Sequence, residues 1–427
     1  MKSKFNNFSF TSSIKTKIIK PKNLQNLIKL IKKKHTISGN CRSYNDSFIG
    51  NYLNISMSNF NKIIYLDKKN ETIEVESGVS LDAINKIIIP NGYVLDCSPG
   101  CKYVSVGGMI SNNINGKLSN KNSIIYKIKS LCVLDKNFKL KNCSLKKNKA
   151  LFHLAIGGKG RVGPIISAVF KLRKINSDQI IQKIYNFNDY RSFKTKIKLI
   201  KNFEYSVVWI NFLKKNFSGI YICGNHVNLK SNLSYKNNDI KLPNIFFLFF
   251  SYMINNKIFT IIFNYLFEFI NFIKQKKKMH LIDFYFPQNK IKNWNYIFKK
   301  QGFIQFHFFF EEKNMSKIID NIKNTFNKNK IYSNFAILKF HKDSYKKFKL
   351  SLSLDIPIKN NFKIIQKIIN KIVLKNNLEV NLSKDIVLDS LNNKTLSTNQ
   401  IFDKNNKRYL MRNNTSNLIE RLASNNA

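Results

Sequence analysis

The chain of 427 residues is poor in acidic residues, glycine and proline. It has 24 Asp and Glu against 73 Lys and Arg, which gives a formal net charge of +49 at pH 7. Such an excess ordinarily indicates a nucleic-acid or anionic-membrane partner. Here the excess is almost all Lys and is spread along the whole chain, as is typical of a biased coding sequence. Because Arg, the better residue for bidentate phosphate recognition, is scarce, we expect no dedicated nucleic-acid binding.

The chain also lacks a pattern of paired cysteines. Its six cysteines are scattered, and the one close pair, Cys97 and Cys101, has neither a second pair nor a nearby His. This spacing predicts no metal site and no disulfide framework, and it favours a reducing, cytoplasmic environment. The N-terminus is basic, with no apolar segment of signal-peptide type before Lys15. We therefore expect no signal peptide.

The few glycines concentrate in residues 99–117 and 157–163. In the first stretch they permit close approach of the main chain or a positive φ, and neighbouring amides can then donate to an anion or a heterocycle. The alternative is a pair of tight turns between strands. The second cluster resembles a dinucleotide fingerprint only superficially, because it follows a helical segment and precedes a strand. We therefore reject a classical NAD site.

Local signals predict a mixed fold. Apolar spacing and caps predict helices at residues 24–31 and 81–88, the second capped by Ser80. Clusters of β-branched residues predict strands from residue 35, at 63–66 and at 72–78, and a hairpin joins 126–134 to 138–143. The glycine clusters disappear after about residue 182, and since single cores stop growing at roughly 250 to 300 residues, we expect two domains.

Residues 245–273 form the most apolar segment. The uninterrupted run at 245–254 is shorter than the roughly 20 residues that a membrane span needs. In the following helix Asn264, Glu268 and Asn271 share one stripe. The segment either packs into the core or lies on a membrane surface, where the basic run at 274–278 would be attracted to anionic lipids.

The later part of the chain returns to strands. We expect strands at 302–310, 335–340 and 348–356, with helices at 318–326 and 362–374 between them. Ile304, Phe306 and Phe308 alternate with Gln305 and His307, so one sheet face is apolar and the other partly polar. A sheet with one polar face, backed by helices, can roof a ligand pocket.

Several motifs together resemble a known family. Residues 39–46 (GNCRSYND), 99–108, 115–117 (NGK) and 157–160 (GGKG) resemble, in order and spacing, the FAD-binding domain of vanillyl-alcohol-oxidase-like flavoproteins. In the second half, residues 286–287, 293–295 (NWN), 302–306, 338–339, 354–357 (LDIP) and 383–385 (SKD) resemble the decaprenylphosphoryl-β-D-ribose 2-oxidase branch. The resemblance covers about residues 37–385.

The resemblance implies an α+β fold, in which a two-subdomain PCMH-type FAD-binding domain precedes an antiparallel-sheet substrate domain with flanking helices. On this basis we expect an N-terminal lead-in at 1–34, the FAD-binding domain at 35–178 and the substrate domain at 179–385. A C-terminal segment, 386–427, would pack back on the FAD-binding domain.

The resemblance also implies which residues hold FAD. The pyrophosphate would be cradled by Gly39, Asn40, Cys41, Arg42, Ser43, Tyr44, Asn45 and Asp46. The flavin and its ribityl chain would contact Gly100, Ser105, Val106, Gly107, Gly108, Asn112, Asn113, Asn115, Gly116 and Asn381, with Ile165 near the adenine. Ser43 stands where some relatives anchor the flavin covalently, so we expect non-covalent FAD.

The implied chemistry is oxidation of a secondary alcohol by hydride transfer to flavin N5. Lys384 would act at the reactive face with Tyr44 and Lys117 nearby, either as an electrostatic stabiliser or as a base. The alternative for Lys384 is an ordinary ion pair with Asp385. The substrate pocket would be lined by Trp209, Gln305, His307, Lys339 and Ser353, although Lys339 could equally face solvent at an edge.

The implied substrate is the 2-hydroxyl of a polyprenyl-phosphate pentose, in the first half of a 2-epimerisation completed by a short-chain reductase partner. Such an enzyme would be cytoplasmic, with peripheral contact to the inner face of the cell membrane. Two alternatives stay open. One is a sugar-lactone or alditol oxidase of the same superfamily, and the other is a basic membrane-associated binding protein without redox activity.

Several positions depart from the family pattern. Cys41 and Asn45 replace usual glycines, Asn115 replaces a usual His, Asn381 replaces an aromatic residue, and Phe306 lacks a usual tyrosine hydroxyl. Together these departures indicate either a different substrate or a homologue with reduced activity.

Overall fold

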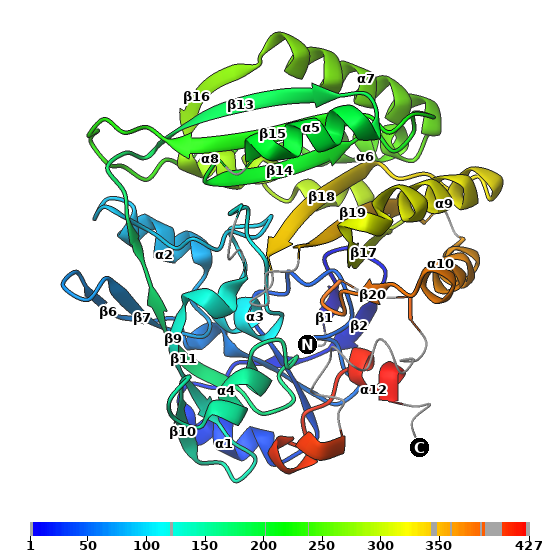
Figure 1. The fold of residues 1–427 in the computed structure, drawn as a ribbon. Helices are drawn as coiled ribbons and strands as arrows, with labels where there is room; N and C mark the ends of the chain where they lie inside the picture. Colours follow the sequence, from blue (N-terminus) through cyan, green and yellow to red (C-terminus); the bar gives the residue numbers. More distant parts are fainter. Residues whose placement is uncertain are drawn as a thin grey trace.

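The computed structural model describes residues 3–119, 123–200, 202–237, 239–342, 348–358, 361–384, 387–388 and 404–423. Helices and strands are mixed, and a large antiparallel sheet follows a smaller α/β region along the chain (Figure 1). The predicted α+β class is confirmed. We call residues 3–178 the N-terminal region and residues 179–384 the sheet region.

The N-terminal region is built on small sheets. β3 (Ile18–Ile19), β5 (Leu53–Ser56) and β4 (His35–Ser38) pair in parallel. An antiparallel sheet has the order β10 (Leu140–Cys143), β9 (Ile128–Leu134), β11 (Ile165–Lys171), β7 (Thr72–Glu76) and β6 (Ile63–Asp67). Two further antiparallel pairs are β1 (Ser3–Asn6) with β2 (Ser13–Thr16) and β8 (Tyr93–Val94) with β12 (Arg173–Lys174).

Helices pack on these sheets through the faces that the sequence predicts. α1 (Leu24–Ile31) begins after Asn23, whose side chain accepts from the Asn26 amide. α2 (Leu81–Ile88) begins after Ser80, whose side chain accepts from the Ala83 amide, so the predicted cap is confirmed. Shorter helices follow, namely α3 (Val106–Ser111) and α4 (Lys149–Ala155).

The sheet region contains an eight-stranded antiparallel sheet. Its order is β16 (Lys276–His280), β13 (Gln179–Phe187), β15 (Gly219–His226), β14 (Tyr205–Ile210), β18 (Phe335–Lys342), β19 (Phe348–Pro357), β17 (Phe303–Glu311) and β20 (Glu379–Val380). One face packs on α5 (Tyr190–Ile200), α9 (Met315–Lys328) and α10 (Phe362–Asn376). Ile304, Phe306 and Phe308 lie in this core, which confirms the predicted apolar face of β17.

The opposite face of the sheet has two different halves. Because successive strand side chains alternate between faces, Trp209 and Ile337 point away from the main core, and they pack with Phe267 of α7 (Lys257–Ile273). Farther along the sheet, Gln305 and Asp355 occupy the same face and hydrogen-bond to each other at 2.7 Å. The second half is therefore polar, and it lies toward the N-terminal region (Figure 1).

The remaining elements are short, except α6 (Asn244–Ile254), which precedes α7. They are α8 (Leu281–Tyr285) and the 3₁₀ helices η1 (Met57–Asn59), η2 (Ile124–Lys127), η3 (Pro287–Lys290), η4 (Trp294–Phe298), η5 (Glu312–Asn314) and η7 (Lys404–Tyr409).

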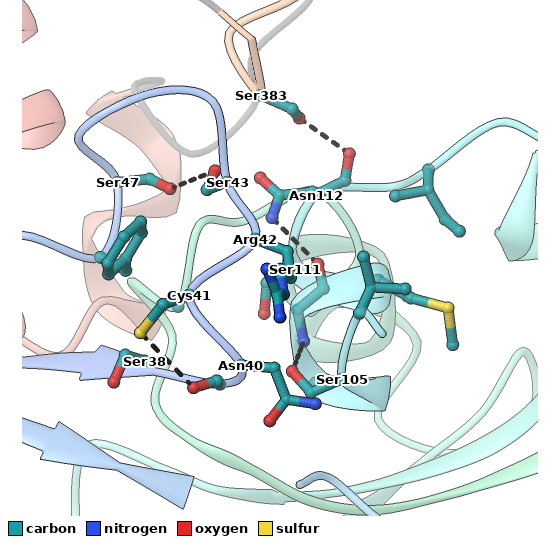
Figure 2. A pocket seen from close by; sticks show the side chains of 18 of the residues that line it. Ser38, Asn40, Cys41, Arg42, Ser43, Ser47, Ser105, Ser111, Asn112 and Ser383 are labelled. Carbon is teal, nitrogen blue, oxygen red and sulfur yellow. Dashed lines mark hydrogen bonds between the residues drawn. The ribbon is translucent and has the colours of Figure 1, made fainter. Parts of the chain in front are cut away.

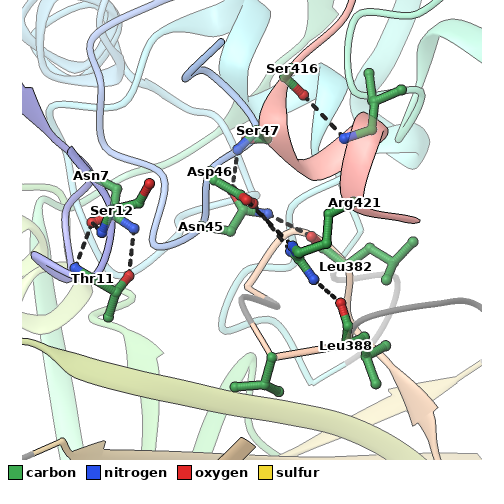
Figure 3. A network of polar contacts seen from close by, with 12 residues as sticks. Asn7, Thr11, Ser12, Asn45, Asp46, Ser47, Leu382, Leu388, Ser416 and Arg421 are labelled. Carbon is green, nitrogen blue, oxygen red and sulfur yellow. Dashed lines mark hydrogen bonds and ion pairs between the residues drawn. The ribbon is translucent and has the colours of Figure 1, made fainter. Parts of the chain in front are cut away.

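The last described segment, residues 404–423, contacts the N-terminal region. The Thr415 amide donates to the His35 carbonyl at 2.9 Å, and Arg421 of α12 (Asn417–Ala423) pairs with Asp46 at 3.2 Å. Figure 3 shows that Arg421 also donates to the Leu388 carbonyl, so one guanidinium links the loop after β4 to residues near the end of the sheet region.

Candidate active site

A cleft of about 1210 Å³, partly open to solvent, lies where the loop after β4 meets α3 and the turn after β20. It is lined by segments far apart in sequence, namely residues 37–44, 99–112, 159–165 and 383–384 (Figure 2). The cleft brings together many of the predicted cofactor residues: Gly39, Asn40, Cys41, Arg42, Ser43, Tyr44, Gly100, Ser105, Gly107, Gly108, Asn112 and Ile165, along with Lys384.

The loop after β4 approaches α3 closely enough to require a glycine. A Cβ at Gly39 would lie 1.9 Å from Ser105 Oγ, and that hydroxyl caps α3 by accepting from the Gly108 amide. Two residues later, Cys41 has a φ of 52°, a left-handed conformation that favours glycine. Cys41 therefore keeps the backbone shape of a glycine turn while placing a thiol in the cleft lining.

Unpaired donors along this loop fit a pyrophosphate. Arg42 Nε is buried and has no hydrogen-bond partner. Among the described residues, the amides of Cys41, Arg42 and Ser43 also have no acceptor. Successive unpaired N–H groups beside a guanidinium form an anion-binding concavity, so these residues fit the phosphates of FAD.

The glycines of α3 allow close packing of the backbone, but their amide groups are not free to donate to a ligand. The Gly107 amide donates to the Ser77 carbonyl at 2.8 Å, and the Gly108 amide donates to Ser105 Oγ. A Cβ at Gly107 would meet Ser77 Cβ at 3.1 Å. Gly107 therefore permits close packing against Ser77, and the amides of Gly107 and Gly108 already have acceptors within the protein.

Asn45 and Asp46 lie behind the cleft lining and connect it to other segments. Asn45 is fully buried and its Nδ2 donates to the Leu382 carbonyl at 2.6 Å, while Asp46 pairs with Arg421 (Figure 3). Asn45, which stands where the family has glycine, therefore ties the loop to the turn that carries Lys384.

Lys384 lies against Tyr44 at the cleft. Its Nζ is 3.5 Å from the centroid of the Tyr44 ring, a cation–π distance. Burial, reinforced by the nearby charge of Lys339, lowers the pKa of Lys384 to about 7, although Asp355 opposes that shift. Burial also raises the pKa of Tyr44 well above its usual value. The predicted partner Asp385 falls outside the described residues.

Asp355 is the carboxylate whose charge acts on the pKa of Lys384. Burial raises the pKa of Asp355 to about 6, and the hydrogen bond from Gln305 Nε2 and the charge of Lys384 act in the opposite direction. Both Gln305 and Asp355 belong to the polar half of the sheet, so the sheet supplies a weak acid beside a weak base.

Other predicted residues at or near the polar half of the sheet are basic groups whose charged forms are disfavoured by burial. Burial lowers the pKa of Lys117 to about 7, with a contribution from Lys339, and Lys117 Nζ donates to the Phe284 carbonyl at 2.8 Å. Burial also lowers the pKa of Lys339. His307 has its pKa held well below the usual value by burial and by Lys384, and its Nε2 is buried without a partner.

A second cavity of about 800 Å³ adjoins the cleft. It is lined by the predicted residues Asn113, Asn115 and Asn381, and it shares Asn112, Lys159 and Ser383 with the first cavity. Asn381 Nδ2 lies 3.0 Å from His307 Nδ1. The three asparagines therefore line a polar space next to the cleft and not the cleft itself.

Lys159 is a site residue that the sequence reasoning missed. Its Nζ donates to Ser383 Oγ and, at 3.3 Å, to Asn112 Oδ1, so it joins the second glycine cluster to the turn bearing Lys384. Burial lowers its pKa to about 7. Among the described residues no carboxylate pairs with it. The signal in the sequence was a lysine between two glycines. In the structure Lys159 itself has a positive φ, of 52°.

Some predicted residues lie outside both cavity linings. Trp209 is 2% exposed and packs on Phe267 with ring centroids 5.0 Å apart. Val106 is fully buried, and a Cβ at Gly116 would meet the Ser98 amide nitrogen at 2.9 Å, so both serve packing. Ser353 lies on the polar half of the sheet, paired across the ladder with His307 and Ile337.

Comparison with known proteins identifies the N-terminal region. Residues 17–144 match the family described as FAD binding domain. Over 134 residues, the chain is 31% identical to decaprenylphosphoryl-beta-D-ribose oxidase of Mycolicibacterium smegmatis, covering 31% of this chain and 29% of that protein. Over 68 residues it is 34% identical to D-lactate dehydrogenase of Anaerostipes hadrus, covering 16% of this chain and 14% of that protein.

The two relatives are thus matched over less than a third of their own length, and the family match at residues 17–144 includes the loop after β4, α3 and the residues between them. The predicted FAD cofactor is confirmed, and the unpaired donors of the loop after β4 fit it. The chain therefore contains an FAD binding domain, takes FAD as its cofactor, and resembles a decaprenylphosphoryl-β-D-ribose oxidase over 134 residues.

Proposed function

We propose that this protein is an FAD-dependent oxidoreductase that oxidises a secondary hydroxyl of a sugar, and that the sugar is a pentose linked to a polyprenyl phosphate. The observation that carries the proposal is the position of Lys384, a desolvated lysine with a pKa of about 7 that lines the FAD cleft and lies over Tyr44. A base with its pKa near the working pH is suited to proton transfer.

Bound FAD would supply the hydride acceptor, and the protein would supply the proton acceptor. Neutral Lys384 accepts the hydroxyl proton of the substrate while the carbinol C–H bond breaks, and so becomes an ammonium. Asp355 stabilises that ammonium, because its charge raises the pKa of Lys384. Tyr44 contributes its ring face, since a cation above an aromatic ring is attracted to it.

The polar half of the sheet would hold the rest of the substrate. Gln305 and Asp355 offer a donor and an acceptor for sugar hydroxyls, and they already orient each other through a 2.7 Å hydrogen bond. Lys117 and Lys339 are desolvated amines at the same place, and a phosphate on the substrate would favour their charged forms. The relative named for decaprenylphosphoryl-β-D-ribose supports this substrate class.

Within this proposal, the oxidised sugar would pass to a short-chain reductase, which would complete a 2-epimerisation. A lipid-linked substrate would bring the enzyme to the inner face of the cell membrane as a peripheral protein. The FAD would be held without a covalent bond, because the Ser43 hydroxyl, which donates to Asn45 Oδ1 at 2.7 Å, is a weak nucleophile at its usual pKa.

A second candidate substrate is a small 2-hydroxy acid. A bound carboxylate would favour the charged forms of Lys117 and Lys339 as a phosphate would, and one relative is named as a D-lactate dehydrogenase. The two candidates share the same base and the same cofactor, and they differ in the anion that the lysines would neutralise.

The test is the visible spectrum of the purified protein, recorded anaerobically with each substrate. We expect flavin at near-unit stoichiometry that bleaches with a polyprenyl-phosphate pentose. Bleaching with D-lactate alone would replace the first candidate with the second. A colourless protein that takes up no FAD would refute both, and would favour a binding protein without redox activity.

A further inference from the structure

The outer faces of α6 and α7 are apolar and exposed. On α6 the side chains of Leu248, Phe249 and Tyr252 are 59%, 61% and 74% exposed. On α7 those of Leu266 and Phe269 are 54% and 61% exposed. Further exposed apolar residues continue the surface over both helices, namely Ile245, Phe246, Phe250, Ile258, Phe259, Ile262, Phe263, Tyr265, Ile270, Phe272 and Ile273. We call this surface the α6–α7 face.

The polar residues of α7 point the other way, into the protein. Thr260 and Asn264 are 4% and 2% exposed, and Thr260 Oγ1 donates to Asn334 Oδ1. Glu268 pairs with Lys214 at 2.5 Å. The predicted polar stripe is therefore the buried side of α7. An ordinary amphipathic helix has the opposite arrangement, with its apolar side in the core and its polar side in water. Of the two alternatives left open by the sequence, core packing does not describe α7.

Neither helix has the length of a membrane span. In the described part of the chain, no single helix is long and apolar enough to cross a bilayer, and α6 and α7 meet that criterion only as a pair bent by 99°. A sharply bent pair whose exposed sides are both apolar can instead lie along a surface, with its side chains entering the headgroup and acyl boundary.

A basic cluster borders the α6–α7 face. Lys274, Lys276, Lys277 and Lys278 follow α7 directly, and all four side chains are exposed. Lys257, at the start of α7, is also exposed. Lysines beside an interfacial helix are attracted to anionic headgroups. The formal net charge of +49 opposes pairing of this face with a second copy of the same chain.

We propose that the α6–α7 face is a docking surface for an anionic lipid bilayer, with its apolar side chains in the membrane interface and the lysines of 274–278 at the headgroups. Docking itself does not require that the protein oxidise any substrate.

One hydrophobic cluster contacts both the end of α6 and the cleft residue Tyr44. Ile254, at the end of α6, packs in one cluster with Trp294, Phe303 and Tyr44, and Phe247 of α6 packs on Tyr296 with ring centroids 5.9 Å apart. If the proposed lipid-linked substrate is right, a docked protein would present its site next to the bilayer that carries that substrate.

The test is co-flotation of the full-length, FAD-loaded protein with vesicles, measured without substrate. Phosphatidylcholine vesicles containing phosphatidylglycerol are compared with vesicles of phosphatidylcholine alone. We expect the wild type to float with the anionic vesicles, and binding to fall with added salt. The partition coefficient should drop roughly 100-fold when three of the lysines are neutralised, in the combined variant Lys276→Gln, Lys277→Gln and Lys278→Gln.

A second variant removes apolar surface that is already exposed, so its fold is preserved: Leu248→Asn, Phe249→Asn, Leu266→Asn and Phe269→Asn together. It should lose vesicle binding by at least ~100-fold, because each apolar side chain contributes to the insertion. Its matched control changes exposed apolar residues elsewhere and should bind as the wild type does: Leu145→Asn, Leu229→Asn, Ile364→Asn and Leu374→Asn.

Three outcomes would overturn the proposal. The first is equal flotation of the wild type and the α6–α7 variant. The second is equal binding of the wild type to neutral and anionic vesicles. The third is a wild-type dimer that forms without vesicles and that the α6–α7 substitutions abolish. The last would assign the face to a second copy. Because flavin bleaching uses no vesicles and flotation uses no substrate, failure of docking and failure of the proposed oxidation are separate results.

Discussion

Lys384 and Lys277 carry the same side chain in opposite surroundings. Lys384 lies in the FAD cleft, where burial lowers its pKa to about 7, and Lys117 and Lys159 are held in the same way. Lys277 stands in a run of exposed lysines on the edge strand of the sheet. The contrast lies in desolvation, which disfavours the charged form of an amine.

This contrast separates two uses of one abundant residue. A desolvated amine near its pKa can take up a proton during a reaction, whereas an exposed amine contributes a fixed charge that salt screens. With lysine spread through the whole chain, sequence position alone does not tell these uses apart. Burial distinguishes the two uses, so substitutions of cleft lysines and of exposed lysines should have different effects.

The largest effect is expected from Lys384→Ala. Removal of a general base lowers kcat by roughly 10² to 10⁴, while the FAD contacts of the loop after β4 stay intact. Anaerobic stopped-flow spectroscopy should therefore find a yellow protein whose flavin scarcely bleaches. The control is Lys136→Ala, an exposed lysine in the turn between β9 and β10, which should react at the wild-type rate. Rapid bleaching in Lys384→Ala would remove Lys384 from the mechanism.

The pH dependence of the wild type should be the next largest effect. Neutral Lys384 is the reactive form, so kcat/KM should rise about tenfold per pH unit below a pKa of about 7 and level off above it. A stabilising ammonium would give the opposite slope, a rate that falls as pH rises through 7. The measured direction therefore decides between the two roles that the sequence left open.

Much of the architecture follows from local sequence. The cap at Ser80, the hairpin of β9 and β10, and the alternation along β17 are short-range patterns, and each predicts the element that forms. Gly39 is visible in the sequence, but the contact with Ser105 that leaves no space for a Cβ at this position is not local.

Other features depend on long-range packing that no local pattern contains. Asn45 binds the carbonyl of Leu382, a residue 337 positions away, so its side chain has a role that a glycine motif conceals. The stripe on α7 was visible in the sequence, but whether it faced solvent or protein depended on Asn334 and Lys214. The contact of Trp209 with Phe267 of α7 also depends on long-range packing.

Lys159→Met should weaken FAD binding about tenfold, because a charge-assisted contact to an anion contributes roughly 1.5 kcal/mol. Lys159 lines the cleft with a desolvated amine, and the FAD phosphates would restore its charge. FAD affinity of the wild type should also fall as pH rises above about 7, and the variant should lose that dependence. Fluorescence titration of the apoprotein measures both.

The apoprotein of Lys159→Met should also be more stable than the wild type at pH 7. The folded-state pKa of Lys159 is about 7, below the usual lysine value of roughly 10.4, so the unfolded chain binds more protons between these values. Stability of the wild-type apoprotein therefore rises with pH across that window, and a neutral Met removes this contribution. An unchanged Tm at pH 7 together with unchanged FAD affinity would mean that Lys159 only fills space.

The smallest shift of the pH profile is expected from Gln305→Leu, which leaves the lysines untouched. Loss of its proposed contact with the sugar lowers the rate at every pH, whereas loss of its hydrogen bond to Asp355 moves the profile along the pH axis. The hydrogen bond from Gln305 lowers the pKa of Asp355, which burial raises to about 6, so its loss leaves Asp355 protonated to a higher pH. Since ionised Asp355 raises the pKa of Lys384, the kcat/KM profile should shift slightly toward acid. Gln179→Leu is the matched control, because Gln179 makes a hydrogen bond of the same 2.7 Å length to Asp178 near the far edge of the sheet. A shift of the kcat/KM profile in both variants, or in neither, would show that Asp355 does not control the pKa of Lys384.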